Sequence, residues 1–107
     1  MKGTYRKNQK GFGFVEIDKE RRSVSQNGEV IQLTSKEYDL LLYFVNNIGM
    51  AFSRDQILNE IWGDNYFGSD RVVDDLLRRL RQKLPTLNVE TIYGYGYRLT
   101  VWERYQS

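Results

Sequence analysis

The stretch RVVDDLLRRLRQKL at positions 71–84 carries the strongest pattern in this chain. At 100° per residue, one side of a helix would gather an apolar stripe made of Val73, Leu76, Leu77, Leu80 and Leu84. The opposite side would gather Arg71, Asp75, Arg78 and Gln82, with Arg79 and Arg81 on its two flanks. We therefore predict an amphipathic helix over about Ser69 to Leu84, with Ser69 as its N-cap and Pro85 beyond its end.

Two shorter helices are predicted before this segment. Thr34 to Glu37 form a capping box, in which the first residue and the fourth satisfy each other's backbone amides. The apolar residues that follow recur at helical spacing, so a helix should run from about Ser35 to Asn47. Ser53 to Gln56 form a second capping box, and Gly63 should end the helix that follows it. Residues 64–70 are then a polar and aromatic loop.

Strand patterns lie on either side of the three helices. Phe12 to Leu33 alternates and contains Asn27-Gly28, a strong signal for a two-residue hairpin turn. We expect three or four short antiparallel strands there. Residues 89–93 and 97–101 alternate around a tip rich in glycine, which predicts a second hairpin. The fold class is therefore α+β: a winged helix-turn-helix domain over residues 12–104, with residues 1–11 as a flexible lead-in or linker.

Composition restricts the kinds of function. The 107 residues suit one domain, and they include neither cysteine nor histidine. Because zinc prefers thiolate and imidazole ligands, a zinc site is not expected, and a Ser-His or Cys-His catalytic apparatus is impossible. We therefore expect no metal, no cofactor and no enzymatic activity. No apolar run approaches the roughly 20 residues of a membrane helix. The absence of cysteine favours a reducing setting, so we expect a cytoplasmic protein.

Charge is concentrated in one segment although the net charge is only +2. Residues 71–83 hold five bases and two acids, whereas the rest of the chain holds 11 bases and 12 acids. A basic amphipathic helix is often only a solvated surface. Here, however, two capped helices precede it and a hairpin follows it, the order in which a recognition helix enters the major groove beside a β wing. The acids Asp74 and Asp75 lie among arginines, which favours salt bridges over Mg²⁺ chemistry.

Several segments, in this order and spacing, are similar to the output domain of OmpR/PhoB-type response regulators. They are residues 33–41 (LTSKEYDLL), 52–58 (FSRDQIL), 61–63 (IWG), 71–74 (RVVD), 78–84 (RRLRQKL) and 91–98 (TIYGYGYR). The resemblance implies promoter binding by a winged helix, an upstream receiver domain, and dimers on DNA formed from domains that are monomeric in isolation. It also leaves open a parent protein anchored by a membrane helix.

The resemblance also suggests residue roles. Positions that touch DNA match Arg71, Arg78, Arg79 and Arg81. Positions that meet the DNA backbone or the wing's groove match Trp62, Arg54, Thr91 and Tyr97. A segment that contacts RNA polymerase matches Asp64, Asn65, Tyr66, Phe67 and Gly68. The rival hypothesis is a protein-interaction module that binds polymerase or a partner regulator through loop 64–70 and the wing.

Three positions depart from the family pattern. Asp75 stands where valine is common and Leu76 where histidine is common, while Tyr93 replaces a frequent arginine of the wing. Asp75 can accept from a cytosine amine, pair with Arg71, Arg78 or Arg79, or repel phosphate. Tyr93 supplies no charge in a minor groove, so the wing should act through stacking and shape or contribute less affinity. The chain's own sequence preference should lie in Asp75 and Gln82, since glutamine pairs well with adenine.

Overall fold

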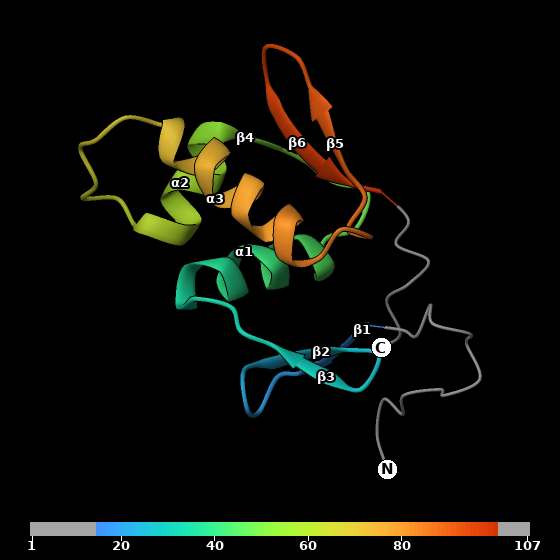
Figure 1. The fold of residues 1–107 in the computed structure, drawn as a ribbon. Helices are drawn as coiled ribbons and strands as arrows, with labels where there is room; N and C mark the ends of the chain where they lie inside the picture. Colours follow the sequence, from blue (N-terminus) through green and yellow to red (C-terminus); the bar gives the residue numbers. More distant parts are fainter. Residues whose placement is uncertain (1–14, 101–107) are drawn as a thin grey trace.

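The computed structural model describes residues 15–100, beginning with a small antiparallel sheet (Figure 1). Strands β1 (Val15–Asp18), β2 (Ser23–Gln26) and β3 (Glu29–Ile31) pair in that order. Asn27 and Gly28 have φ of 57° and 81°, which confirms the predicted hairpin turn between β2 and β3. The sheet therefore has three strands among the described residues. The expected contribution of Phe12 lies outside them.

Helices α1 (Ser35–Val45) and α2 (Arg54–Trp62) both begin at the predicted capping boxes. In each box the N-cap hydroxyl accepts from the amide three residues on, and that residue's side chain accepts from the N-cap amide. Helix α1 ends two residues before the predicted Asn47, with Asn46 as its C-cap. Gly63 ends α2 at a φ of 89°, as expected of a glycine stop. No helix within residues 15–100 is both long enough and apolar enough to span a bilayer.

Helix α3 (Arg71–Lys83) buries the predicted apolar stripe. All five of its members are at most 3% exposed and belong to one core with residues of α1, α2 and the C-terminal strands. The helix begins two residues later than predicted. Asp70 is its N-cap and makes no side-chain capping bond, whereas the Ser69 hydroxyl accepts from the Arg71 amide at 3.1 Å. Ser69 therefore satisfies one free amide from a position just outside the helix.

The C-terminal hairpin belongs to a three-stranded sheet. Strands β5 (Val89–Ile92) and β6 (Gly96–Leu99) form the hairpin, and β4 (Ala51–Ser53) pairs with the other edge of β6. The sequence did not predict β4, which is only three residues long and has no alternating pattern of its own. In Figure 1 the hairpin lies beside α3, while the N-terminal sheet lies beyond α1 at the other end of the molecule.

Gly96 is a packing position and not only part of a loose tip. It pairs with Ser53 of β4, and a Cβ at Gly96 would lie 1.9 Å from the carbonyl oxygen of Phe52. The turn itself depends on Gly94, whose φ is 77°. The close approach at Gly96 anchors the wing to the strand that leads into α2.

A partly buried ion pair joins α1 to the end of α3. The Glu37 side chain is 2% exposed, and its Oε1 accepts from Lys83 Nζ at 2.7 Å and from the Thr34 amide at 2.9 Å. Burial raises the pKa of Glu37, but the hydrogen bonds from Lys83 and Thr34 and the charge of Lys83 outweigh it, so the net pKa is lowered. Glu37 therefore stays ionised and links the two helices.

Gly96→Ala should lower the free energy of unfolding by about 1–3 kcal/mol, because the new Cβ must push β6 away from β4. Urea denaturation measures this change. Gly94→Asn is the matched control: no atom lies within 4 Å of its Cβ position, and asparagine tolerates positive φ. A Gly96→Ala protein as stable as the wild type would contradict the close approach of β4 and β6.

Lys83→Met should lower the free energy of unfolding by about 1–3 kcal/mol at pH 7, since it leaves the Glu37 carboxylate buried without its cation. A carboxyl with a lowered pKa stabilises the fold above its unfolded pKa, and that contribution is lost as the pH falls through the folded pKa. The loss caused by Lys83→Met should therefore shrink in acid, where Glu37 is neutral in both proteins. Urea titrations at pH 7 and at low pH measure it, with the exposed Lys19→Met as control. An equal loss at both pH values would refute the charge argument.

Candidate nucleic-acid interface

The exposed side of α3 is the side opposite its buried stripe. The side chains predicted to face outward there are indeed exposed: Arg71, Asp75, Arg78, Arg79 and Gln82. They come from one rigid helix whose rotation is fixed by its buried leucines, so they present a defined surface. An α-helix with such a surface fits the major groove of B-DNA, where arginine and glutamine side chains can reach base edges.

The exposed arginines of α3 differ in whether they form an ion pair. Arg78 donates to Asp75 at 3.3 Å, and both side chains are more than half exposed. Such an exposed pair contributes little to stability, so it can rearrange when a ligand arrives. Within residues 15–100, Arg71 and Arg79 form no ion pair, and their full positive charges face solvent.

Arg81 has a structural contact that the sequence did not predict. Its guanidinium donates to the backbone carbonyl of Val89, so it ties the last turn of α3 to the first residue of β5. The residue is half-buried, unlike Arg71, Arg78 and Arg79. The structure therefore places Arg81 at the junction of helix and wing, whereas the family pattern grouped it with the three exposed arginines.

Asp74 joins α2, α3 and β6 in one polar network. It accepts from Arg54 Nε at 3.0 Å and from the Tyr97 hydroxyl, and the Arg54 guanidinium lies 5.5 Å from the centre of the Tyr97 ring. The hydrogen bond to Asp74 raises the pKa of Arg54. Burial, followed by the hydrogen bond to Asp74, raises the pKa of Tyr97. Its hydroxyl therefore keeps its proton and remains a hydrogen-bond donor.

This network gives a structural contact to two of the predicted site residues, Arg54 and Tyr97. Tyr97 is buried and its hydroxyl is engaged, while Arg54 is half-buried and paired. Both hold α2, α3 and the wing together at the border of the exposed face of α3. The prediction of salt bridging for the Asp74-Asp75 pair holds, although Asp74 pairs with Arg54, which lies 20 residues away, and only Asp75 pairs within α3.

The wing presents tyrosines at its tip and no basic side chain there. Tyr93 is 93% exposed and Tyr95 is 46% exposed, on either side of Gly94. Thr91 is half-buried on β5, opposite Tyr97. Arg98 of β6 is paired with Glu90 of β5 at 2.6 Å. The tip is therefore uncharged and aromatic, as expected from Tyr93.

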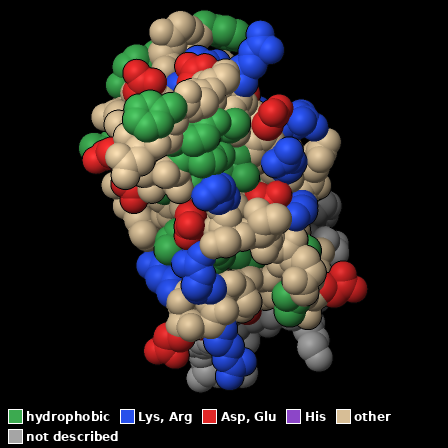
Figure 2. Space-filling view, turned by 90° about the vertical axis from the view of Figure 1, so that its left-hand side faces the viewer, with side chains coloured by type: hydrophobic (Ala, Val, Ile, Leu, Met, Phe, Trp, Pro, Cys, Tyr) green, Lys and Arg blue, Asp and Glu red, His purple; other side chains and the backbone are tan. Residues whose placement is uncertain are grey.

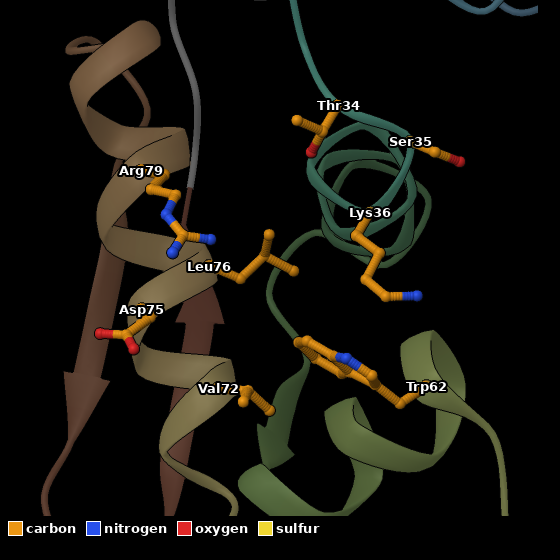
Figure 3. Close-up of a pocket in the computed structure, with 8 residues that line it drawn as sticks. All are labelled: Thr34, Ser35, Lys36, Trp62, Val72, Asp75, Leu76 and Arg79. Carbon is orange, nitrogen blue, oxygen red and sulfur yellow. The ribbon is translucent and has the colours of Figure 1, made fainter. Parts of the chain in front are cut away.

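A cleft of about 520 Å³ separates the start of α1 from α3 (Figure 3). Trp62, at the end of α2, lies between the two helices, with Lys36 Nζ 5.5 Å from the centre of its ring. The other residues that line the cleft are Thr34, Ser35, Val72, Asp75, Leu76 and Arg79. The cleft therefore continues the exposed face of α3 toward α1. Sequence reasoning missed Lys36, since its place beside Trp62 depends on the packing of α1 against α2.

Loop 64–70 connects α2 to α3 and projects from the side of the domain seen in Figure 2. Its Phe67 is 93% exposed, whereas Tyr66 is half-buried with its ring centre 6.0 Å from that of Trp62. Asp64, Asn65 and Gly68 are exposed. Figure 2 shows apolar side chains gathered in the upper half of this face, next to acidic and basic ones. The predicted partner-binding loop is thus accessible, with one prominent apolar side chain.

Residues 15–100 contain no group of three acidic, histidine or cysteine side chains able to hold a metal ion. The polar groups that the structure brings together lie on the exposed face of α3 and in the neighbouring cleft. They are guanidinium, ammonium, amide and carboxylate groups. Such groups recognise anionic and hydrogen-bonding partners.

Comparisons with known proteins agree with this geometry. Residues 28–99 match the family model described as "Transcriptional regulatory protein, C terminal". The transcriptional regulatory protein CssR of Bacillus subtilis (strain 168) is 53% identical over 94 residues, which cover 87% of this chain and 42% of CssR. The transcriptional regulatory protein VxrB of Vibrio cholerae is 49% identical over 83 residues, which cover 78% of this chain and 34% of VxrB. The chain therefore spans less than half the length of these relatives.

Solved structures show the same fold. The crystal structure of the DNA-binding domain of Bacillus subtilis CssR aligns with a TM-score of 0.75 at 52% identity, covering 90% of this chain and 99% of that domain. The Klebsiella pneumoniae RstA DNA-binding domain, solved in complex with the RstA box, aligns with a TM-score of 0.69 at 31% identity, covering 78% of this chain and 88% of that domain. The α+β winged-helix fold and the resemblance drawn from the sequence are both confirmed. The chain belongs to the family of transcriptional regulatory protein C-terminal domains of OmpR/PhoB type.

Proposed function

We propose that this chain binds double-stranded promoter DNA sequence-specifically, as the output domain of a two-component response regulator. Helix α3 enters the major groove and the β5–β6 hairpin lies at the adjacent minor groove. The observation that carries the proposal is the exposed face of α3, where Arg71 and Arg79 remain unpaired among residues 15–100, beside a wing anchored to the same core. The RstA domain, solved with its DNA box, supports it by family likeness.

The roles proposed for the side chains follow from their surroundings. Arg71 and Arg79 contact phosphates or guanine, because no carboxylate holds them in the described part of the chain. Arg78, Asp75 and Gln82 read base edges from the centre of the exposed face. Trp62, Arg54, Thr91 and Tyr97 lie at its borders, where Tyr97 and Arg54 act by fixing α3 and the wing. Tyr93 contacts the sugar-phosphate edge or stacks in the minor groove without supplying charge.

We propose further that a receiver domain precedes this chain in the full-length protein and that the protein dimerises on DNA. The length of the relatives supports this, since the matched region is 42% of CssR. A second candidate function is contact with RNA polymerase through loop 64–70, and the almost fully exposed Phe67 favours it. Binding to polymerase by a chain without measurable DNA binding would make that second function the main one.

Replacing both Arg78 and Arg79 with alanine should weaken specific binding by about 10- to 100-fold per lost base contact and reduce the salt slope by about one per lost phosphate contact. Fluorescence anisotropy with a selected duplex at several salt concentrations measures both quantities. The control removes two basic residues, Lys19 and Arg21, from the exposed β1–β2 turn. Specific binding unchanged by the α3 substitutions would rule out α3 as the recognition helix.

Asp75→Ala should change the preferred base at one position of the bound site, because it removes a cytosine-amine acceptor and releases Arg78 from its pair. Affinity for random duplex should rise slightly, since one acid no longer repels phosphate. Selection from a random DNA pool reveals the preferred site of each protein. Asp64→Ala makes the same charge change on loop 64–70 and should return the wild-type site. An identical site for Asp75→Ala would show that Asp75 does not contribute to specificity.

A further inference from the structure

The cleft between α1 and α3 brings together cations from two different helices. Lys36 reaches it from the first turn of α1 and Arg79 from the middle of α3, with Trp62 of α2 between them (Figure 3). These positions are 43 residues apart in the chain, so neither belongs to the sequence pattern of the other. The cleft opens beside the exposed face of α3, since Asp75 and Arg79 belong to both.

The charge of the cleft is positive. Among the described residues that line it, Asp75 is the single acid, and it pairs with Arg78 outside the cleft at 3.3 Å. Neither Lys36 nor Arg79 has a carboxylate partner within residues 15–100. The two cations therefore outnumber the one acid among these residues, so the cleft attracts an anion.

Lys36 is also held in place. Its ammonium lies 5.5 Å from the centre of the Trp62 ring, a cation–π distance, although a free lysine side chain would sample many rotamers. Trp62 is itself fixed by packing against the core and by its neighbour Tyr66. The lysine charge is thus held beside the Trp62 ring, at the α1 side of the cleft, before any ligand arrives, which lowers the entropic cost of binding.

We propose that this cleft binds one backbone phosphate of the DNA, with Lys36 and Arg79 contacting it from opposite sides. The proposal rests on the proposed function, because it assumes that α3 lies in the major groove. Phosphate, and not a base, is the expected ligand because Lys36 lies on α1, outside the helix that enters the groove, and an ammonium binds phosphate as a point charge. Lys36 is therefore a positioning contact that sets the register of α3 and reads no sequence.

Lys36→Gln tests this directly, because glutamine removes the charge but keeps a polar side chain that is only one atom shorter and has a similar helix propensity. The salt slope should fall by about 0.9, and affinity at 0.1 M salt should fall by about fivefold to tenfold, equally for specific and random duplexes. Lys19→Gln is the control: it makes the same charge change at an exposed lysine of the β1–β2 turn, which does not line the cleft and donates instead to Asn46, beyond the end of α1. Thermal melting confirms that both variants are folded.

A second measurement identifies the phosphate. Replacing backbone phosphates one at a time with neutral methylphosphonates should reveal one position at which wild-type binding weakens but Lys36→Gln binding weakens much less. Arg79→Gln should show the same loss of sensitivity at that position. If the two variants remain as sensitive as the wild type at every position, or if Lys36→Gln behaves as Lys19→Gln does, the cleft is not a phosphate site. In that case wild-type binding would still support the proposed function, whereas a wild type that binds no duplex would overturn both.

Discussion

The burial of one apolar stripe on α3 is the constraint on which the rest of the domain depends. Five side chains of this stripe are nearly inaccessible and pack into the core that α1, α2 and the C-terminal strands share. Burying a leucine side chain stabilises the folded state by about 1.5–3 kcal/mol. Rotating α3 by even one position would expose several of these side chains to water and lose that stabilisation. The rotation of the helix, and with it the direction of every charged side chain, is therefore set by the leucines.

Polar contacts then fix α3 along its length, and some of its charged side chains are engaged in these contacts. Lys83 pairs with the buried Glu37 of α1, Asp74 pairs with Arg54 and Tyr97, and Arg81 binds the start of β5. These contacts lie on the borders of the helix, where it meets its neighbours. The charges left over lie on the outward side and at the cleft, so stability and recognition use different residues of the same short sequence.

The local features of the fold could be predicted from the sequence because local rules determine them. The helical period of residues 71–84, the capping boxes at Thr34 and Ser53, and the Asn27-Gly28 turn each depend on a few adjacent residues. Strand β4 could not be predicted, since it exists only because Gly96 allows β6 to approach Phe52, more than 40 residues away. The helix start moved from Ser69 to Arg71 for a subtler reason, since Ser69 caps an amide without adopting the N-cap position.

The sequence was enough to predict which side chains form the exposed surface of the candidate site. It was not enough to predict which contacts each of them makes. Periodicity placed the arginines of α3 on one side. It could not separate Arg81, whose partner lies on another element, from Arg71 and Arg79, which have no ion-pair partner within residues 15–100. The same holds for Lys36, whose position beside Trp62 depends on how α1 meets α2. Contacts between distant segments decide which cations stay available, and these contacts have no signature in a single sequence.

The most direct test of the central claim is to map backbone amide shifts by nuclear magnetic resonance while the chain is titrated with a duplex that it selects. The proposed arrangement predicts that the largest changes fall on the exposed side of α3, at the start of α1 and at the wing tip, with little change in β1–β3. Changes confined to loop 64–70 or to the N-terminal sheet, with α3 unaffected, would contradict it.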